Sequence, residues 1–178
     1  MRKISLAVAV VFCLAAAFTV QSASRPVGTI KVVSPGIGLE LKMGDKPAPV
    51  PNGKEIPLPP ATYTPFRITC GAKAGAEIWT IKCTGPGPLF GQLKEIIVAD
   101  GQVTNIEAGQ PFTIKVSVSN PNGAGGKPAL IGMSIVGKSG EVYTANTLMK
   151  GLSIAPKPQF KIVDESGTTL AKGEFEYG

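Results

Sequence analysis

Hydrophobic and polar residues alternate along much of this chain. The clearest run is residues 112–119, in which four apolar side chains alternate with polar ones (Phe112, Ile114, Val116 and Val118), and residues 37–43 have the same pattern. A period of two buries one face of a β-strand and leaves the other in water. No window beyond the N-terminal segment has a convincing helical period, and 22 Gly and 16 Pro leave little room for one. The pattern predicts an all-β protein.

Turn residues separate the apolar runs. Asp100-Gly101 lies between two of them and predicts a two-residue hairpin, while 120–126 and 164–167 are further turn segments rich in Gly, Asn and Asp. Short strands with Gly and Pro turns at this spacing are typical of a sandwich or a barrel. We expect about ten strands, starting near Thr29, Ile37, Tyr63, Glu77, Leu93, Val103, Phe112, Ala129, Phe160 and Thr169.

The fold class expected is one or two small antiparallel β-sandwiches, Ig-like or prealbumin-like, after a signal peptide. Residues 107–110 are the only plausible hinge. They divide the chain into a β-sandwich domain at 23–109 and a smaller Ig-like sandwich at 110–178. A single continuous sandwich is the alternative.

The N-terminal segment, residues 1–22, has the order of a secretory signal peptide. Arg2 and Lys3 precede an uncharged apolar stretch at 4–20, and small residues follow at 22–24. An apolar run of this length barely spans a bilayer, so an uncleaved anchor is the alternative. We expect cleavage after residue 22, with residue 23 as the alternative, and a secreted or periplasmic location, with no membrane contact beyond the signal peptide.

Two cysteines, Cys70 and Cys83, remain after the signal peptide. An even number in an exported chain favours a disulfide, and the parity of each with its apolar neighbours turns both sulfurs into the core. Register argues against the bridge, because a tight hairpin at 74–75 would offset the two cysteines along the strands. We predict the Cys70–Cys83 disulfide, formed across a longer loop or between facing sheets.

Composition excludes most catalytic classes. The chain has no histidine, which removes the commonest general base and the commonest metal ligand, so no catalytic residue, metal site or cofactor is predicted. Its net charge is +6, but the lysines are scattered singly, whereas a nucleic-acid surface concentrates basic residues among aromatic ones. A glycoside hydrolase that uses only carboxylates is a distant alternative.

Tyr143 is the best candidate for a ligand-binding surface. It lies in the glycine-rich segment 137–151, and loops of this kind carry function on sandwich scaffolds. Trp79 shares parity with Ile81 and Cys83, which favours core packing over a binding role.

The segment 56–64, Ile-Pro-Leu-Pro-Pro-Ala-Thr-Tyr-Thr, resembles the entry to the last strands of carboxypeptidase-regulatory-like (transthyretin-like) domains, with Ala61 in place of that family's glycine. Residues 160–167 and 173–178 resemble the tail of uncharacterised exported bacterial β-sandwich proteins. The first resemblance implies a non-catalytic role in adhesion, spacing or folding support, and it carries over no site residues.

These features together favour an exported, non-catalytic β-sandwich module. We expect it to bind or space a protein or glycan of the cell envelope, and not nucleic acid. The alternative is a subunit of a surface assembly whose edge strands pair between copies.

Overall fold

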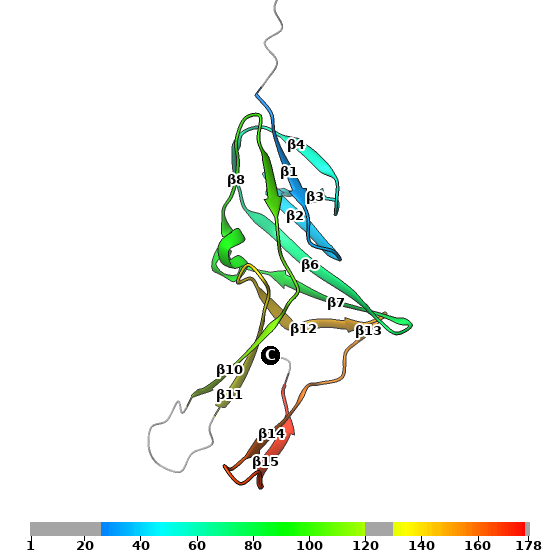
Figure 1. Ribbon diagram of the computed structural model, residues 1–178, viewed down its shortest axis with the longest axis vertical. Helices are drawn as coiled ribbons and strands as arrows, with labels where there is room; N and C mark the ends of the chain where they lie inside the picture. Colours follow the sequence, from blue (N-terminus) through cyan, green and yellow to red (C-terminus); the bar gives the residue numbers. More distant parts are fainter. Residues whose placement is uncertain (1–25, 120–129, 177–178) are drawn as a thin grey trace, which may run out of the picture.

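The computed structural model of this protein describes residues 26–119 and 130–176, and it is built almost entirely of strands (Figure 1). This confirms the all-β, sandwich-like fold class. The elements are β1 (Gly28–Val32), β2 (Ile37–Met43), β3 (Lys46–Val50), β4 (Glu55–Leu58), β5 (Ala61–Tyr63), β6 (Pro65–Ala74), β7 (Glu77–Thr84), η1 (Gly87–Lys94), β8 (Ile96–Val98), β9 (Val103–Ile106), β10 (Thr113–Ser119), β11 (Leu130–Val136), β12 (Val142–Lys150), β13 (Ser153–Ile154), β14 (Gln159–Val163) and β15 (Thr169–Glu174).

One long sheet connects most of these strands. Its order is β10-β11-β12-β7-β6-β2-β3, with β13 paired to β12. A second, three-stranded sheet has β1 in the middle, antiparallel to β4 and parallel to β9. The strands β5 and β8 form a short pair, and β14 and β15 form a hairpin.

The core lies between the three-stranded sheet and the β2–β6–β7 part of the long sheet. Alternate residues of β1 and β2 point into it, including Ile30, Val32, Leu39 and Leu41, which are at most 2% exposed. The 3-10 helix η1 adds Phe90. The period-two pattern at 37–43 therefore predicted the buried face correctly for Ile37, Leu39 and Leu41, whereas Met43 at the end of the strand is exposed.

The run at 112–119 differs from this expectation. In β10 every residue is exposed, and Ile114, Val116 and Val118 are 62%, 62% and 69% exposed. The reason is that β10 is an edge strand with one neighbour, and its apolar face has no close-packed second layer. The alternation marks a real strand, but its apolar face is open.

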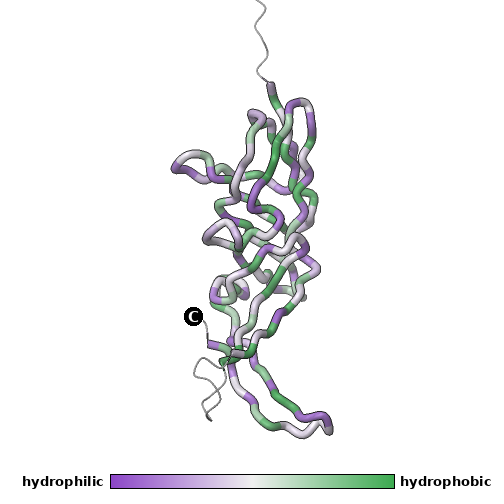
Figure 2. Tube along the Cα trace, turned by 90° about the vertical axis from the view of Figure 1, so that its left-hand side faces the viewer, coloured by the Kyte–Doolittle hydropathy of each residue, from purple (hydrophilic) through white to green (hydrophobic). Residues whose placement is uncertain are grey.

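The β10–β11 and β14–β15 hairpins extend away from the core as two arms (Figure 1). Hydrophobic stretches continue into this end of the molecule, far from the core, in Figure 2. The long sheet also continues across the expected boundary at 109/110, because β12 pairs with β7 and Tyr143 belongs to the core cluster.

Three local expectations were wrong. Asp100-Gly101 is a turn, but β8 pairs with β5 and β9 with β1, so the strands on either side of it do not form a hairpin. Leu93 lies in η1, and the strand that follows begins at Ile96. The segment 137–151 is not a long loop, since most of it is β12. The expected signal peptide and the turn at 120–126 lie outside the described residues.

Candidate functional site: an apolar groove between two hairpins

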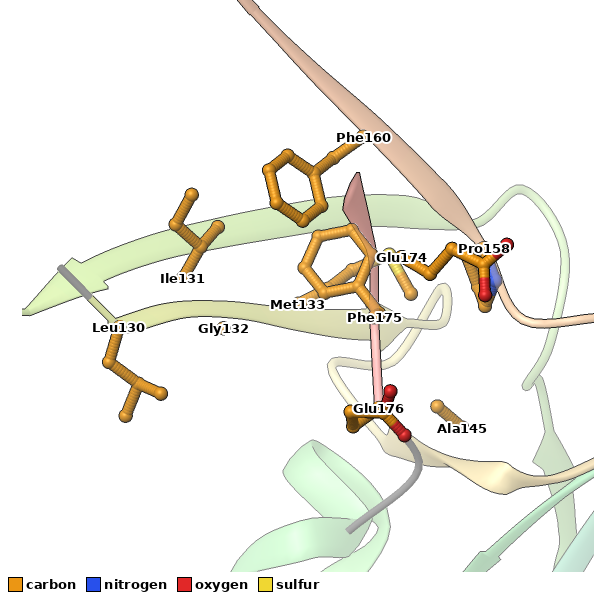
Figure 3. Close-up of a pocket in the computed structure, with 10 residues that line it drawn as sticks. All are labelled: Leu130, Ile131, Gly132, Met133, Ala145, Pro158, Phe160, Glu174, Phe175 and Glu176. Carbon is orange, nitrogen blue, oxygen red and sulfur yellow. The ribbon is translucent and has the colours of Figure 1, made fainter. Parts of the chain in front are cut away.

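An open groove lies between the two hairpin arms. Two adjoining hollows of about 430 and 680 Å³ share five lining residues, which are Ile131, Met133, Pro158, Phe160 and Phe175. Figure 3 shows the first hollow, lined by Ile131 and Met133 of β11 and by the rings of Phe160 and Phe175 from the other arm. The groove therefore has one wall from each hairpin.

The β10–β11 hairpin supplies a wall of cross-strand apolar pairs. The register sets Ile114 opposite Ile135, Val116 opposite Met133 and Val118 opposite Ile131. Directly opposite side chains in an antiparallel pair share one face, so these pairs form a continuous apolar surface. The alternating apolar residues of 112–119 therefore contribute to this surface.

The β14–β15 hairpin supplies the facing wall. The rings of Phe160 and Phe175 pack with centroids 5.3 Å apart, and Ile162 continues the same face. Gly173 lies opposite Phe160 in the ladder, and a Cβ at Gly173 would lie 2.8 Å from the Phe160 ring. The absence of a side chain there lets the Phe160 ring lie flat on the strand.

Few polar groups line the groove. Among its described lining residues, only four are polar, namely Gln159, Lys161, Glu174 and Glu176. Glu176 pairs with Lys157 at 2.5 Å, and Gln159 donates to Glu174 at 3.4 Å. Polar groups that already pair with one another do not converge on a reacting atom, so the lining is suited to apolar contact.

The two ends of the long sheet differ. At one end, β3 carries Pro47 and Pro49, which lack the N–H needed to pair with a further strand. At the other end, β10 has no proline and a single charge, Lys115. Proline and lysine are common means of protecting sheet edges, so within the described chain β10 is the less protected edge.

A buried carboxylate fixes the base of the β10–β11 arm. Glu141 is 0% exposed and accepts hydrogen bonds from the Gly109 N–H at 2.5 Å, the Ser139 N–H at 2.9 Å and the Tyr143 hydroxyl at 3.1 Å. Gly109 precedes β10 and Ser139 lies in the β11–β12 turn. Glu141 thus joins both ends of the arm to the core, a role that the sequence pattern did not reveal.

Tyr143 is not a surface residue, which corrects its assignment as a ligand-binding candidate. It is 2% exposed, and its ring packs edge-on against Phe112 at 5.3 Å. Burial, followed by the negative charge of Glu141, raises the pKa of the Tyr143 phenol far above its usual range. The phenol donates a hydrogen bond to Glu141, and the Tyr143 side chain is part of the core.

Cys70 and Cys83 are both buried, as their parity predicted, but both are free thiols, so the predicted disulfide is absent. In the β6–β7 hairpin, Cys70 lies opposite Ile81 and Cys83 opposite Ile68. Such diagonal neighbours are typically about 7–8 Å apart, which is beyond normal disulfide geometry. The Cys83 thiol instead donates to the Leu89 carbonyl at 3.3 Å.

Burial also changes the chemistry of these thiols. It raises the pKa of Cys83 to about 11 and raises that of Cys70, with the charge of Glu141 adding to both. Such thiols stay protonated at neutral pH and are poor nucleophiles.

Within residues 26–119 and 130–176, no three His, Cys, Asp or Glu side chains gather into a metal site. The helical part of the same residues contains nothing long and apolar enough to cross a bilayer. No protein-family model, curated protein or solved structure matches the chain.

Proposed function

We propose that this protein is an exported, non-catalytic binding module whose hairpin groove receives an extended apolar segment of a protein partner. The observation that carries the proposal is the exposed apolar face of β10, with Ile114, Val116 and Val118 more than 60% exposed at the less protected end of the long sheet. The export part of the proposal rests on the signal-like residues 1–22.

The form of the groove favours a strand as the ligand. An added strand satisfies the free N–H and C=O groups of a sheet edge, and its alternate side chains fill the apolar face beside that edge. Both features meet at β10. The groove between the arms is apolar over most of its length and is open along its side.

A protein segment suits this lining better than a glycan. Sugars are held by hydrogen bonds and by exposed aromatic faces, whereas the two aromatic rings here pack against one another and three of the four polar lining residues already have a partner. Trp79 lies outside the groove on β7, and its ring is covered by the Lys150 ammonium at 5.7 Å.

A labelled heptapeptide of alternating valine and serine tests the proposal by fluorescence anisotropy. We expect saturable binding to the purified protein and none for a peptide of the same composition with its valines in one block. Met133→Glu, which places a charge in the groove wall, should abolish binding. Val103→Glu is the matched control, since Val103 is 50% exposed on β9, outside the groove lining. Equal binding of both peptides, or no binding of either, would contradict the proposal.

A further inference from the structure

The strand that β10 accepts must come from outside the described fold. Each of the apolar strands β1, β2, β6 and β7 is already paired in a sheet. The segment that follows β10 in the sequence, Asn120 to Ala129, is rich in Gly, Pro and Asn and has no apolar alternation. A strand that pairs with the β10 edge must alternate apolar and polar residues, and β10 itself has this pattern.

We propose that β10 pairs antiparallel with β10 of a second copy, about a two-fold axis at Val116. This inference rests on the proposed function and names the strand that pairs with the β10 edge, at the open side of the groove. Val116 is the middle residue of Thr113–Ser119, so all seven residues of each strand take part. Val116 then lies opposite Val116 of the other copy, and Ile114 lies opposite Val118.

The charges and faces agree with this register. Lys115 of each copy lies opposite Ser117 of the other, so no like charges face each other. A register centred on Lys115 would place two lysines together, and one centred on Ser117 would pair only five residues. Because directly opposite residues share a face, the apolar columns of both hairpins join into one continuous surface.

The same arrangement closes on itself. A two-fold interface uses the same patch on both copies and leaves no second β10 edge for further growth. The other end of each long sheet is β3, where Pro47 and Pro49 oppose the addition of a strand. The pairing therefore produces a discrete dimer.

Charge substitution at the axis tests the inference by sedimentation equilibrium on the purified protein. We expect the wild type to dimerise and Val116→Lys to raise the dimer dissociation constant at least about tenfold, since it sets two lysines opposite each other. Val116→Glu should do the same, and an equimolar mixture of the two should associate again as a heterodimer. Val116 is 62% exposed, so both variants retain the core.

A second substitution tests the register independently. Ser117→Glu places a carboxylate opposite Lys115 at two symmetric positions and should lower the dissociation constant a few-fold, whereas Ser117→Lys should raise it. Val103→Lys, on an exposed position of β9, is the control and should leave association unchanged. Opposite effects of glutamate and lysine at residue 117 are not expected for a contact elsewhere on the surface.

The results separate this inference from the proposed function. A protein that stays monomeric, or that dimerises equally well with Val116→Lys, overturns the β10 dimer. If that protein still binds the alternating peptide, the groove retains its proposed function with a different occupant. If it binds neither a second copy nor the peptide, both proposals are wrong.

Discussion

Replacing Glu141 by alanine is expected to destabilise the protein strongly, although Glu141 lies outside the groove. The carboxylate accepts hydrogen bonds from the Gly109 N–H, the Ser139 N–H and the Tyr143 hydroxyl, and the first and third of these contacts are buried. An unsatisfied buried donor costs about 1–3 kcal/mol. Two such donors, less the relief of burying a charge, give a loss of about 3 kcal/mol in the free energy of unfolding.

Urea denaturation followed by fluorescence measures this loss. With an m-value of about 2 kcal/mol per M, a loss of 3 kcal/mol lowers the urea midpoint by about 1.5 M. Tyr143→Phe keeps the ring against Phe112 and removes one hydroxyl donor, so it should cost only about 1 kcal/mol. The control is Glu107→Ala, which removes an exposed carboxylate paired with Lys138 and should change stability by less than about 0.5 kcal/mol.

The variants also test whether the three contacts act as a unit. If Glu141 accepts the Tyr143 hydrogen bond as described, Tyr143→Phe should have a smaller effect in the Glu141→Ala background than alone. An unfolding free energy for Glu141→Ala within 0.5 kcal/mol of the wild type would refute the reasoning, because the carboxylate would then not hold these donors.

Five further predictions concern other parts of the chain. Both thiols should resist alkylation at pH 8 and react rapidly in urea. Folding raises the pKa of Cys83 from 9.0 to about 11, so the contribution of this thiol to stability should be complete below pH 9 and lost as the pH rises towards 11. The urea midpoint should therefore fall between pH 8 and pH 10, and it should fall less in Cys83→Ala. Gly91→Ala should lower the urea midpoint, because Gly91 has φ +57° and a Cβ there would lie 2.4 Å from the backbone of the β11–β12 turn. Truncation after Gly173 removes Phe175 and should abolish binding of the alternating peptide while leaving the thermal melt of the core nearly unchanged, since the β14–β15 hairpin contributes no residue to the core cluster. Intact-mass measurement of exported protein should show the loss of 22 to 24 N-terminal residues, and a full-length mass would contradict the signal peptide.

Periodicity predicted strands well but did not predict which faces are covered. The same alternation occurs at 37–43 and at 112–119, yet Leu39 is buried and Val116 is exposed. Local sequence determines that apolar side chains share a face, whereas burial depends on which element lies over that face. Which element lies over a face is decided by segments far away in the sequence. For β10, which is at the end of a sheet, no element packs closely over the apolar face.

The candidate site was harder to predict, for related reasons. Tyr143 was selected because glycines surround it, but those glycines allow close packing around a buried side chain: a Cβ at Gly137 would lie 2.1 Å from the Glu141 carboxylate. Glu141 itself looks like an ordinary surface acid in the sequence. Its three donors come from residues 109, 139 and 143, so only the fold brings the first of them to it.

The position of β1 has a consequence for the order in which the fold can assemble. It is the middle strand of its sheet, and its parallel neighbour β9 ends at Ile106. A chain that emerges N-terminus first, from a ribosome or through a membrane pore, must deliver some 75 further residues before β1 can be enclosed on both sides. Until then Ile30 and Val32 have no complete core to enter. Of the three strands in its sheet, β1 is thus the first to emerge, yet its pairing is completed only when β9, the last of the three, has followed.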